Sequence, residues 1–403
     1  MTTVEIPTER FRLSMLLYDT RYRSLTIQCI ALLAFMLAAA WLVNNTVRNL
    51  EALGKTFDFG FLWARSGYDI NQHLIPYTND DTHGRAAIVG ILNTFLVAIL
   101  GCVLATVLGV LIGVLRLSRN WLVSRLAGAY VDVFRNVPVL LWILAFMAVL
   151  TDMAPAPTAF RGENATAHMI FGAVAITNRG FYIPWPVLAQ GWQIVAIFFL
   201  LGCAAATAFG RYAHARQEAT GEILPVFWIK AALIVFPTLL ADVLAGGTIS
   251  FSIPELKRFN FEGGGFIDKS LIALWLALSF YTASYIAENV RAGIQAISRG
   301  QSEAAGALGL RPARIMSLVI LPQAMRVIIP PLISQYLNLT KNSSLAIAVG
   351  YMDARATLGG ITMNQTGREL ECMLLLMAFY LIVSLLISSV LNWYNARVAL
   401  KER

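Results

Sequence analysis

The sequence predicts an all-α polytopic membrane protein with about eight transmembrane helices. Of its 403 residues, 58% are hydrophobic and only 13% are charged, whereas a soluble domain carries about 25% charged residues. Eight apolar segments are long enough to cross a hydrocarbon core of ~30 Å, which takes ~20 helical residues. They lie near residues 25–44, 88–115, 130–150, 190–210, 223–246, 267–290, 327–349 and 371–394.

Basic residues beside these segments predict the orientation of the chain, because cytoplasmic flanks carry an excess of arginine and lysine. They precede the first segment and follow the second, fourth, sixth and eighth, so all of them fall on one side. They are Arg10, Arg12, Arg21, Arg23, Arg116, Arg119, Arg125, Arg211, Arg216, Arg291, Arg299, Arg311, Arg314, Arg397, Lys401 and Arg403. We expect both termini on the cytoplasmic side. The net charge of +8 needs no nucleic-acid partner, since no basic run has interleaved aromatic residues.

A polar segment, residues 291–326, separates the sixth and seventh apolar segments and has the chemistry of a helix–turn–helix. Gly309 is a natural helix stop, because only glycine takes a positive φ angle at no steric cost. Pro312 fits the first turn of a second helix, and Ala304 and Ala305 give the first helix a low profile that can enter a groove. The same pattern is compatible with an interfacial helix pair whose arginines touch lipid headgroups.

The spacing within this segment resembles the cytoplasmic coupling loop of ABC-importer permeases. Glu303-Ala304-Ala305 is followed after three residues by Gly309, and then by Val319 and Leu321-Pro322 at the family's spacing. Val319 stands where the family more often has isoleucine. The resemblance implies that Glu303, Ala304, Ala305, Gly309, Leu321 and Pro322 couple this chain to an ATPase.

Further blocks resemble the polar-amino-acid (histidine/glutamine/glutamate) branch of that family, and the resemblance covers roughly residues 86–150 and 266–400. The blocks are Arg135-Asn136-Val137-Pro138, Tyr285-Ile286-Ala287-Glu288, Arg291-Ala292-Gly293-Ile294, Gly300-Gln301, Leu321-Pro322-Gln323-Ala324 and Lys341-Asn342-Ser343-Ser344-Leu345. Ser284 replaces the alanine that usually opens the second block. Phe57-Asp58-Phe59, Gly67-Tyr68-Asp69-Ile70 and Leu74-Ile75-Pro76-Tyr77 look most like the Q-type permease of the general L-amino-acid transport system.

The resemblance divides the chain into a permease core of the type I ABC-importer kind and two additions. Residues 1–87 hold a cytoplasmic segment, the first transmembrane helix and a periplasmic loop. Residues 88–150 form the first part of the core, and residues 151–266 are an insertion with two extra transmembrane helices. Residues 267–403 form the second part of the core, with the coupling loop at 291–326.

The resemblance also implies a bacterial inner-membrane complex that imports L-amino acids. Its other members would be a second, related permease, two cytoplasmic ATPase subunits that bind ATP and magnesium, and a periplasmic amino-acid-binding protein. This chain has no Walker-type loop, no nucleophile–base set and no cluster with metal-ligand spacing. We therefore expect no catalytic residue, metal or cofactor on it, and its remaining partner is membrane lipid.

Charged and polar residues inside apolar segments are candidates for function, because a charge at mid-bilayer costs roughly 2.5–3.5 kcal/mol. Asp132 with Arg135, and Glu288 with Arg291, have i,i+3 spacing and are predicted to form structural ion pairs, with substrate contact as the alternative.

Lys341, Asn342, Ser343 and Ser344 crowd polar atoms into the seventh segment. Polar and irregular backbone at membrane depth is tolerated only where protein buries it or water lines it. These residues are predicted to line the translocation pathway, with hydrogen bonds between helices as the alternative.

Two other classes of function are weighed against the residues. An ion-coupled secondary transporter or a channel would need acids near mid-membrane and half-helices related by an inverted repeat, but acids here are few and near segment ends. An intramembrane enzyme would need paired aspartates, a serine–histidine couple or an HExxH motif, and none is present. The spacing of Gly109 and Gly113 permits close helix packing, either within the chain or at a dimer seam.

Overall fold

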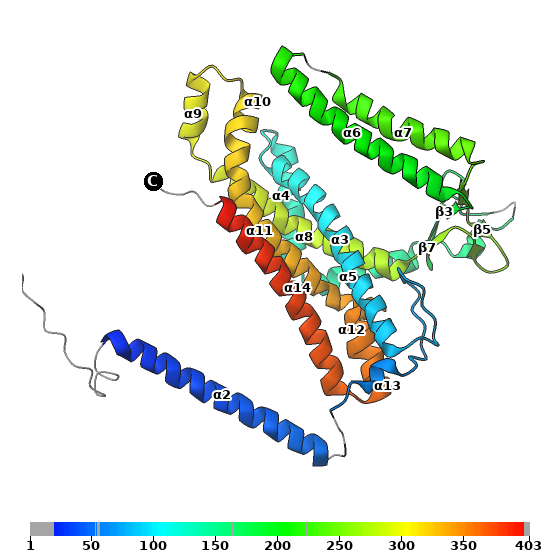
Figure 1. Cartoon of the computed structure of the whole chain (residues 1–403), viewed down its shortest axis with the longest axis vertical. Coiled ribbons are helices and arrows are strands. Elements are labelled where there is room, and N and C mark those ends of the chain that lie inside the picture. Colours follow the sequence, from blue (N-terminus) through cyan, green and yellow to red (C-terminus); the bar gives the residue numbers. More distant parts are fainter. Residues whose placement is uncertain (1–19, 53, 55–56, 163–164, 223, 399–403) are drawn as a thin grey trace, which may run out of the picture. The chain divides into compact units, whose positions relative to one another are not determined.

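A computed structural model of the chain describes residues 20–52, 54, 57–162, 165–222 and 224–398 (Figure 1). The flanking residues Arg10, Arg12, Lys401 and Arg403 lie outside the described residues. The chain forms two compact units, Met1–Ala64 and Arg65–Arg403.

The first unit is built on one long helix, α2 (Thr20–Ala52), which is followed by a 3₁₀ turn, η1 (Gly60–Trp63). No residue in the apolar stretch of α2 is buried within the structure. A helix that is apolar on every side and this long has the character of a membrane span. The first predicted span, near residues 25–44, is therefore confirmed.

Four long helices form the centre of the second unit: α3 (His83–Arg116), α8 (Lys269–Gln295), α11 (Leu321–Asn342) and α14 (Glu369–Val398). Helix α8 packs against both α3 and α11, and α11 packs against α14 (Figure 1). Of the most apolar window of α8, 72% is buried. The shared core includes Val97, Leu274, Leu278, Ile286 and Leu339.

Side-chain caps begin these helices where the sequence offers an oxygen to the first free N–H groups. The Thr82 hydroxyl accepts from the Arg85 backbone N–H before α3. The Asp268 carboxylate accepts from the Ser270 N–H at 2.7 Å before α8. Asn120 accepts from two N–H groups at the start of α4 (Trp121–Asn136).

The predicted span near residues 130–150 contains a sharp bend. It is a broken pair, α4 and α5 (Val139–Asp152), whose axes meet at 106°. The break falls at Val137-Pro138, because proline has no N–H to continue the ladder and disfavours helical geometry in the residue before it. Val137 is accordingly extended, with φ −108° and ψ 131°. With this pair counted as one span, the described residues hold eight candidate spans, as predicted.

The seventh span is longer than predicted and absorbs the second helix of the polar segment. Helix α10 (Pro312–Ile315), the π-helical turn η3 (Met316–Ile320), α11 and the 3₁₀ turn η4 (Ser343–Val349) form one stretch of 38 residues. A continuous helical segment then leads into α14. It consists of α12 (Ala354–Ala356), the π-helical η5 (Thr357–Thr362) and α13 (Met363–Thr366), and its α12 and η5 parts pack against α3.

The insertion contains its two predicted spans, α6 (Trp192–Thr220) and α7 (Val226–Leu244), which pack against each other. A Cβ added at Gly202 would lie 2.6 Å from the Leu233 carbonyl oxygen, so glycine permits this close approach.

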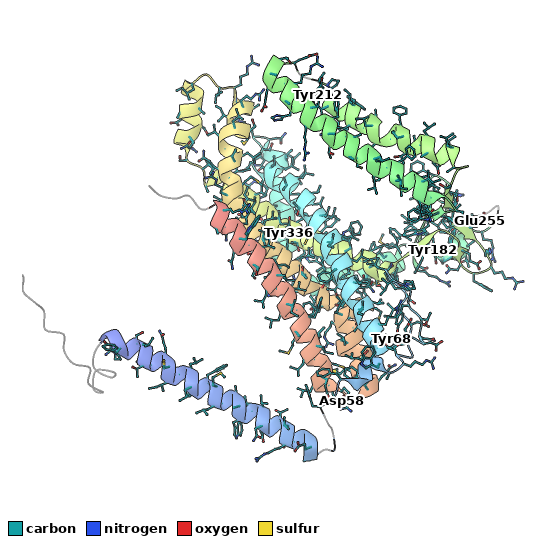
Figure 2. The ribbon with its side chains drawn as sticks, viewed as in Figure 1. Asp58, Tyr68, Tyr182, Tyr212, Glu255 and Tyr336 are labelled. Carbon is teal, nitrogen blue, oxygen red and sulfur yellow. The ribbon has the colours of Figure 1, made fainter. Side chains whose placement is uncertain are left out.

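The described residues of the rest of the insertion, together with the two residues that follow it, form a 3₁₀ turn and seven short strands. The turn is η2 (Pro157–Phe160), and the strands are β1 (Ala175–Thr177), β2 (Gly180–Ile183), β3 (Trp185–Leu188), β4 (Ile249–Ser252), β5 (Glu255–Leu256), β6 (Phe261–Glu262) and β7 (Gly265–Asp268). They form antiparallel sheets in the orders β1-β2-β7, β3-β4 and β5-β6. Tyr182 in β2, which is labelled in Figure 2, donates to Asn260 Oδ1 at 2.6 Å and packs on Phe261. Because β7 runs directly into α8, the sheet ties the insertion to the core.

Candidate functional site

The predicted coupling segment, residues 291–326, begins with the last residues of α8, which ends at Gln295, and continues into a short exposed helix, α9 (Arg299–Ala307). Gly309 ends the turn after it with φ +79°, the positive value predicted from the sequence. Pro312 opens α10 in its first turn, also as predicted. Glu303 and Ala304 are exposed, and Leu321 and Pro322 are exposed at the start of α11.

Ala305 departs from the predicted low-profile outer face, since it is only 5% exposed. Helix α9 packs on the π-helical turn η3, and Gln323 Nε2 donates to Gln301 Oε1 at 3.4 Å. The two arms of the segment are therefore held together within the chain. The coupling role of these residues stays a prediction.

One of the two predicted ion pairs, Glu288 with Arg291, is formed, and a third residue joins it. Arg291 Nη2 lies 2.6 Å from Glu288 Oε1, and Arg116 from the end of α3 also pairs with Glu288. Only the spacing within α8 could be read from the sequence, whereas the contact with Arg116 depends on how α3 packs on α8. The three side chains connect the C-terminal ends of α3 and α8.

The other predicted ion pair, between Asp132 and Arg135, is not formed in the described part of the chain. The Arg135 guanidinium instead lies over the ring of Tyr285, with Cζ 5.1 Å from the ring centroid. Residue 135 is next to the last residue of α4, where that helix lies against α8. The aromatic face of α8 therefore provides a cation–π contact there. Asp132 lines a separate surface cavity with Arg125.

A polar cavity of 260 Å³ lies between α8 and α11. It is lined by Tyr281, Thr282, Tyr285, Gln335, Asn338, Lys341 and Asn342. The hydroxyls of Tyr281 and Tyr285 are 3.0 Å apart. Tyr281, Thr282 and Gln335 were not predicted as cavity residues. The i,i+4 spacing of the two tyrosines and the i,i+3,i+7 spacing of Gln335, Asn338 and Asn342 could have indicated them.

Ser343 and Ser344 do not line this cavity, unlike their neighbours Lys341 and Asn342. The Ser343 hydroxyl is fully buried and donates to the Thr340 carbonyl at 2.7 Å. The Ser344 hydroxyl donates to the Lys341 carbonyl at 2.7 Å. Both serine hydroxyls donate to backbone carbonyls where the α-helix changes to 3₁₀ geometry. Of the four predicted residues, Lys341 and Asn342 therefore line the cavity, whereas Ser343 and Ser344 bond the end of the helix.

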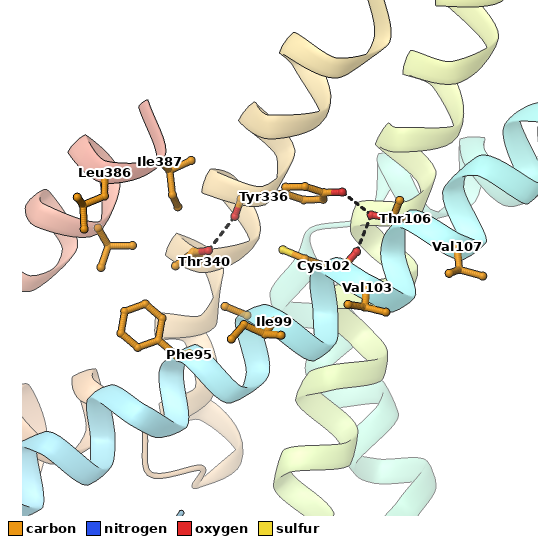
Figure 3. Close-up of a pocket in the computed structure, with 12 residues that line it drawn as sticks. Phe95, Ile99, Cys102, Val103, Thr106, Val107, Tyr336, Thr340, Leu386 and Ile387 are labelled. Carbon is orange, nitrogen blue, oxygen red and sulfur yellow. Dashed lines mark hydrogen bonds between the residues drawn. The ribbon is translucent and has the colours of Figure 1, made fainter. Parts of the chain in front are cut away.

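A larger cavity of 630 Å³ lies on the opposite side of α11, between α3 and α14 (Figure 3). Its walls are mostly apolar, and its polar groups are bonded within the protein. Thr106 Oγ1 lies 2.7 Å from the Tyr336 hydroxyl, and Thr340 Oγ1 donates to the Tyr336 carbonyl at 2.8 Å. This cavity suits apolar chains, whereas the polar cavity suits a charged or zwitterionic solute.

The described residues hold seven helices long and apolar enough to cross a membrane, or eight with the bent pair, which is the character of a multi-pass membrane protein. Residues 219–401 match the family model described as "Binding-protein-dependent transport system inner membrane component". The glutamate/glutamine/aspartate/asparagine transport system permease protein BztB of Rhodobacter capsulatus is 55% identical, over 98% of each chain.

Two further relatives also match nearly the whole chain. The general L-amino acid transport system permease protein AapQ of Rhizobium johnstonii is 44% identical over 98% of this chain and 96% of its own. The putative amino-acid ABC transporter permease protein YhdX of Escherichia coli is 44% identical over 94% of this chain and 95% of its own. The chain belongs to the family of amino-acid ABC-transporter permeases, as its motifs predicted, and is a permease subunit of such a transporter.

Proposed function

We propose that this permease moves L-amino acids from the periplasm to the cytoplasm, and that the polar cavity between α8 and α11 is part of its pathway. One observation supports this most directly. The helical stretch Pro312–Val349 begins at the coupling turn and carries the cavity residues Lys341 and Asn342 near its other end. A movement at the turn therefore reaches the cavity through one continuous element.

The proposed complex contains a second permease, two ATPase subunits that hold ATP and magnesium, and a periplasmic amino-acid-binding protein. The chain would lie in the bacterial inner membrane with both termini in the cytoplasm. Closure of the ATPases on ATP would move α9 and its attached helix, and the cavity would change the side on which it opens. This is a two-state mechanism in which ATP and the loaded binding protein each favour one state.

The proposal is tested by reconstituting the complex in liposomes with loaded binding protein outside and ATP inside. We expect uptake of labelled glutamate or glutamine only when both are present. The alternative, an ion-coupled transporter or channel, predicts uptake by this chain alone in response to an ion gradient. Uptake of that kind, without ATPase or binding protein, would replace the importer proposal.

The topology gives a first prediction, tested in a variant whose native cysteines are replaced by alanine. A cysteine at Phe259, which is 72% exposed in the insertion, is expected to react with a membrane-impermeant thiol reagent in intact cells. A cysteine at Ser302 in α9 is expected to react only after the cells are opened, since the basic flanks predict a cytoplasmic position. Labelling of position 302 in intact cells would reverse the orientation.

The cavity gives a second prediction. Asn342→Leu removes a polar wall group and adds apolar volume, so uptake is expected to fall about tenfold while the complex still assembles. The matched control is Ile99→Leu in the apolar cavity, a volume-conserving change that is expected to leave uptake nearly unchanged. Normal uptake by an assembled Asn342→Leu complex would remove this cavity from the pathway.

A further inference from the structure

The polar cavity carries a positive charge that no lining carboxylate balances. Among the described residues, Lys341 is the only basic side chain that lines it, and no aspartate or glutamate does so. Within the described residues, no carboxylate oxygen lies within 4.0 Å of the Lys341 ammonium. A cation at membrane depth without a protein partner is costly, and such residues mark the paths of substrates and ions. This ammonium is therefore available to a negatively charged solute.

A second cation lies behind the opposite wall. Arg135 stacks on Tyr285, whose hydroxyl is 3.0 Å from that of Tyr281, and both tyrosines line the cavity. The guanidinium adds positive potential from the α4 side, while Lys341 contributes its charge from α11. Three amide side chains on α11, Gln335, Asn338 and Asn342, supply both donors and acceptors. The cavity thus combines neutral groups for a zwitterion with one free charge.

We propose that Lys341 binds the side-chain carboxylate of transported glutamate or aspartate, and that it thereby separates these acidic amino acids from glutamine and asparagine. This inference rests on the proposed function. An amide can accept a hydrogen bond from the ammonium, but it cannot neutralise its charge. A carboxylate forms a charge-assisted hydrogen bond with the ammonium, which is stronger than the bond that a neutral amide accepts.

The test compares initial uptake of glutamate and glutamine by the reconstituted complex, with the same binding protein throughout. Each glutamate-to-glutamine ratio is divided by the wild-type ratio, so that the preference of the binding protein cancels. Lys341→Met is expected to lower this normalised ratio roughly tenfold, mainly through glutamate. Lys341→Arg retains the charge and is expected to restore part of it, although the planar guanidinium has a different shape.

The matched control is Arg326→Gln, which removes one positive charge from the exposed side of the same helix, outside the cavity lining. We expect an unchanged ratio. A wild-type ratio in Lys341→Met would overturn the assignment, and so would an equal loss of glutamate and glutamine uptake in that variant. Absence of all amino-acid uptake by the wild-type complex would instead contradict the proposed function.

Discussion

Replacement of Gly309 by valine is expected to abolish both amino-acid uptake and the stimulation of ATP hydrolysis by loaded binding protein. Gly309 has φ +79°, and no heavy atom lies within 4 Å of the place where a Cβ would be. The obstacle is therefore conformational rather than steric. A β-branched residue held at positive φ costs about 1–3 kcal/mol, which is enough to displace the turn between α9 and α10.

The measurement is the rate of ATP hydrolysis in liposomes, with and without loaded binding protein, after correct insertion of the variant has been confirmed. Gly300→Val is the matched control, because Gly300 lies in the first turn of α9 and a Cβ there also meets no atom within 4 Å. Gly300 is not at positive φ, so the control is expected to retain most of the stimulation. Binding of amino acid to the separate periplasmic protein is expected to stay unchanged in both variants.

Ala305→Trp is expected to have the same effect for a different reason. Ala305 is buried where α9 packs on the adjoining helix, so an indole would force the two arms of the coupling segment apart. Wild-type stimulation in correctly inserted Gly309→Val and Ala305→Trp complexes would show that this segment does not couple the permease to an ATPase.

Features that depend on local chemistry could be predicted from the sequence. Gly309 could be assigned a positive φ because its neighbours have helical chemistry, and Pro312 marks a helix start by its missing N–H. The spans were found from length and polarity alone, because lipid requires about twenty apolar residues. Span ends were less accurate, since the π-helical turn η3 lets α10 continue into α11 without a break.

Features that depend on tertiary packing could not be predicted. The i,i+3 spacing predicted an ion pair for Asp132 with Arg135 just as it did for Glu288 with Arg291. Arg135 instead stacks on Tyr285, because α4 packs against α8, and this packing cannot be read from the spacing. The strands of the insertion are two to four residues long. Segments this short give too few positions to recognise as strands in the sequence. The pairs β2–β7 and β3–β4 join segments more than 60 residues apart, so they depend on how the chain packs.

Replacement of Gly109 by leucine is expected to prevent stable folding of the permease. A Cβ at Gly109 would lie 2.6 Å from Ile286 Cβ and 3.0 Å from the Ala283 carbonyl oxygen. A Cβ at Gly113 would lie 2.8 Å from the Ala287 carbonyl oxygen. Both glycines therefore place α3 directly against the backbone of α8. Backbone atoms cannot move aside as a flexible side chain can, so we expect a cost at or above the usual 1–3 kcal/mol for overpacking.

The yield of monodisperse protein and its thermal unfolding midpoint measure this effect. Gly128→Leu in α4 is the matched control, because a Cβ there meets no heavy atom within 4 Å. Gly109→Ala combined with Ile286→Gly removes the closest contact, so the double variant is expected to lose less stability than the sum of the losses of the two single variants. The glycine pair would then act within one chain, as the contacts between α3 and α8 indicate. A Gly109→Leu chain that folds normally but fails to join its partner permease would instead place a dimer seam on this face of α3.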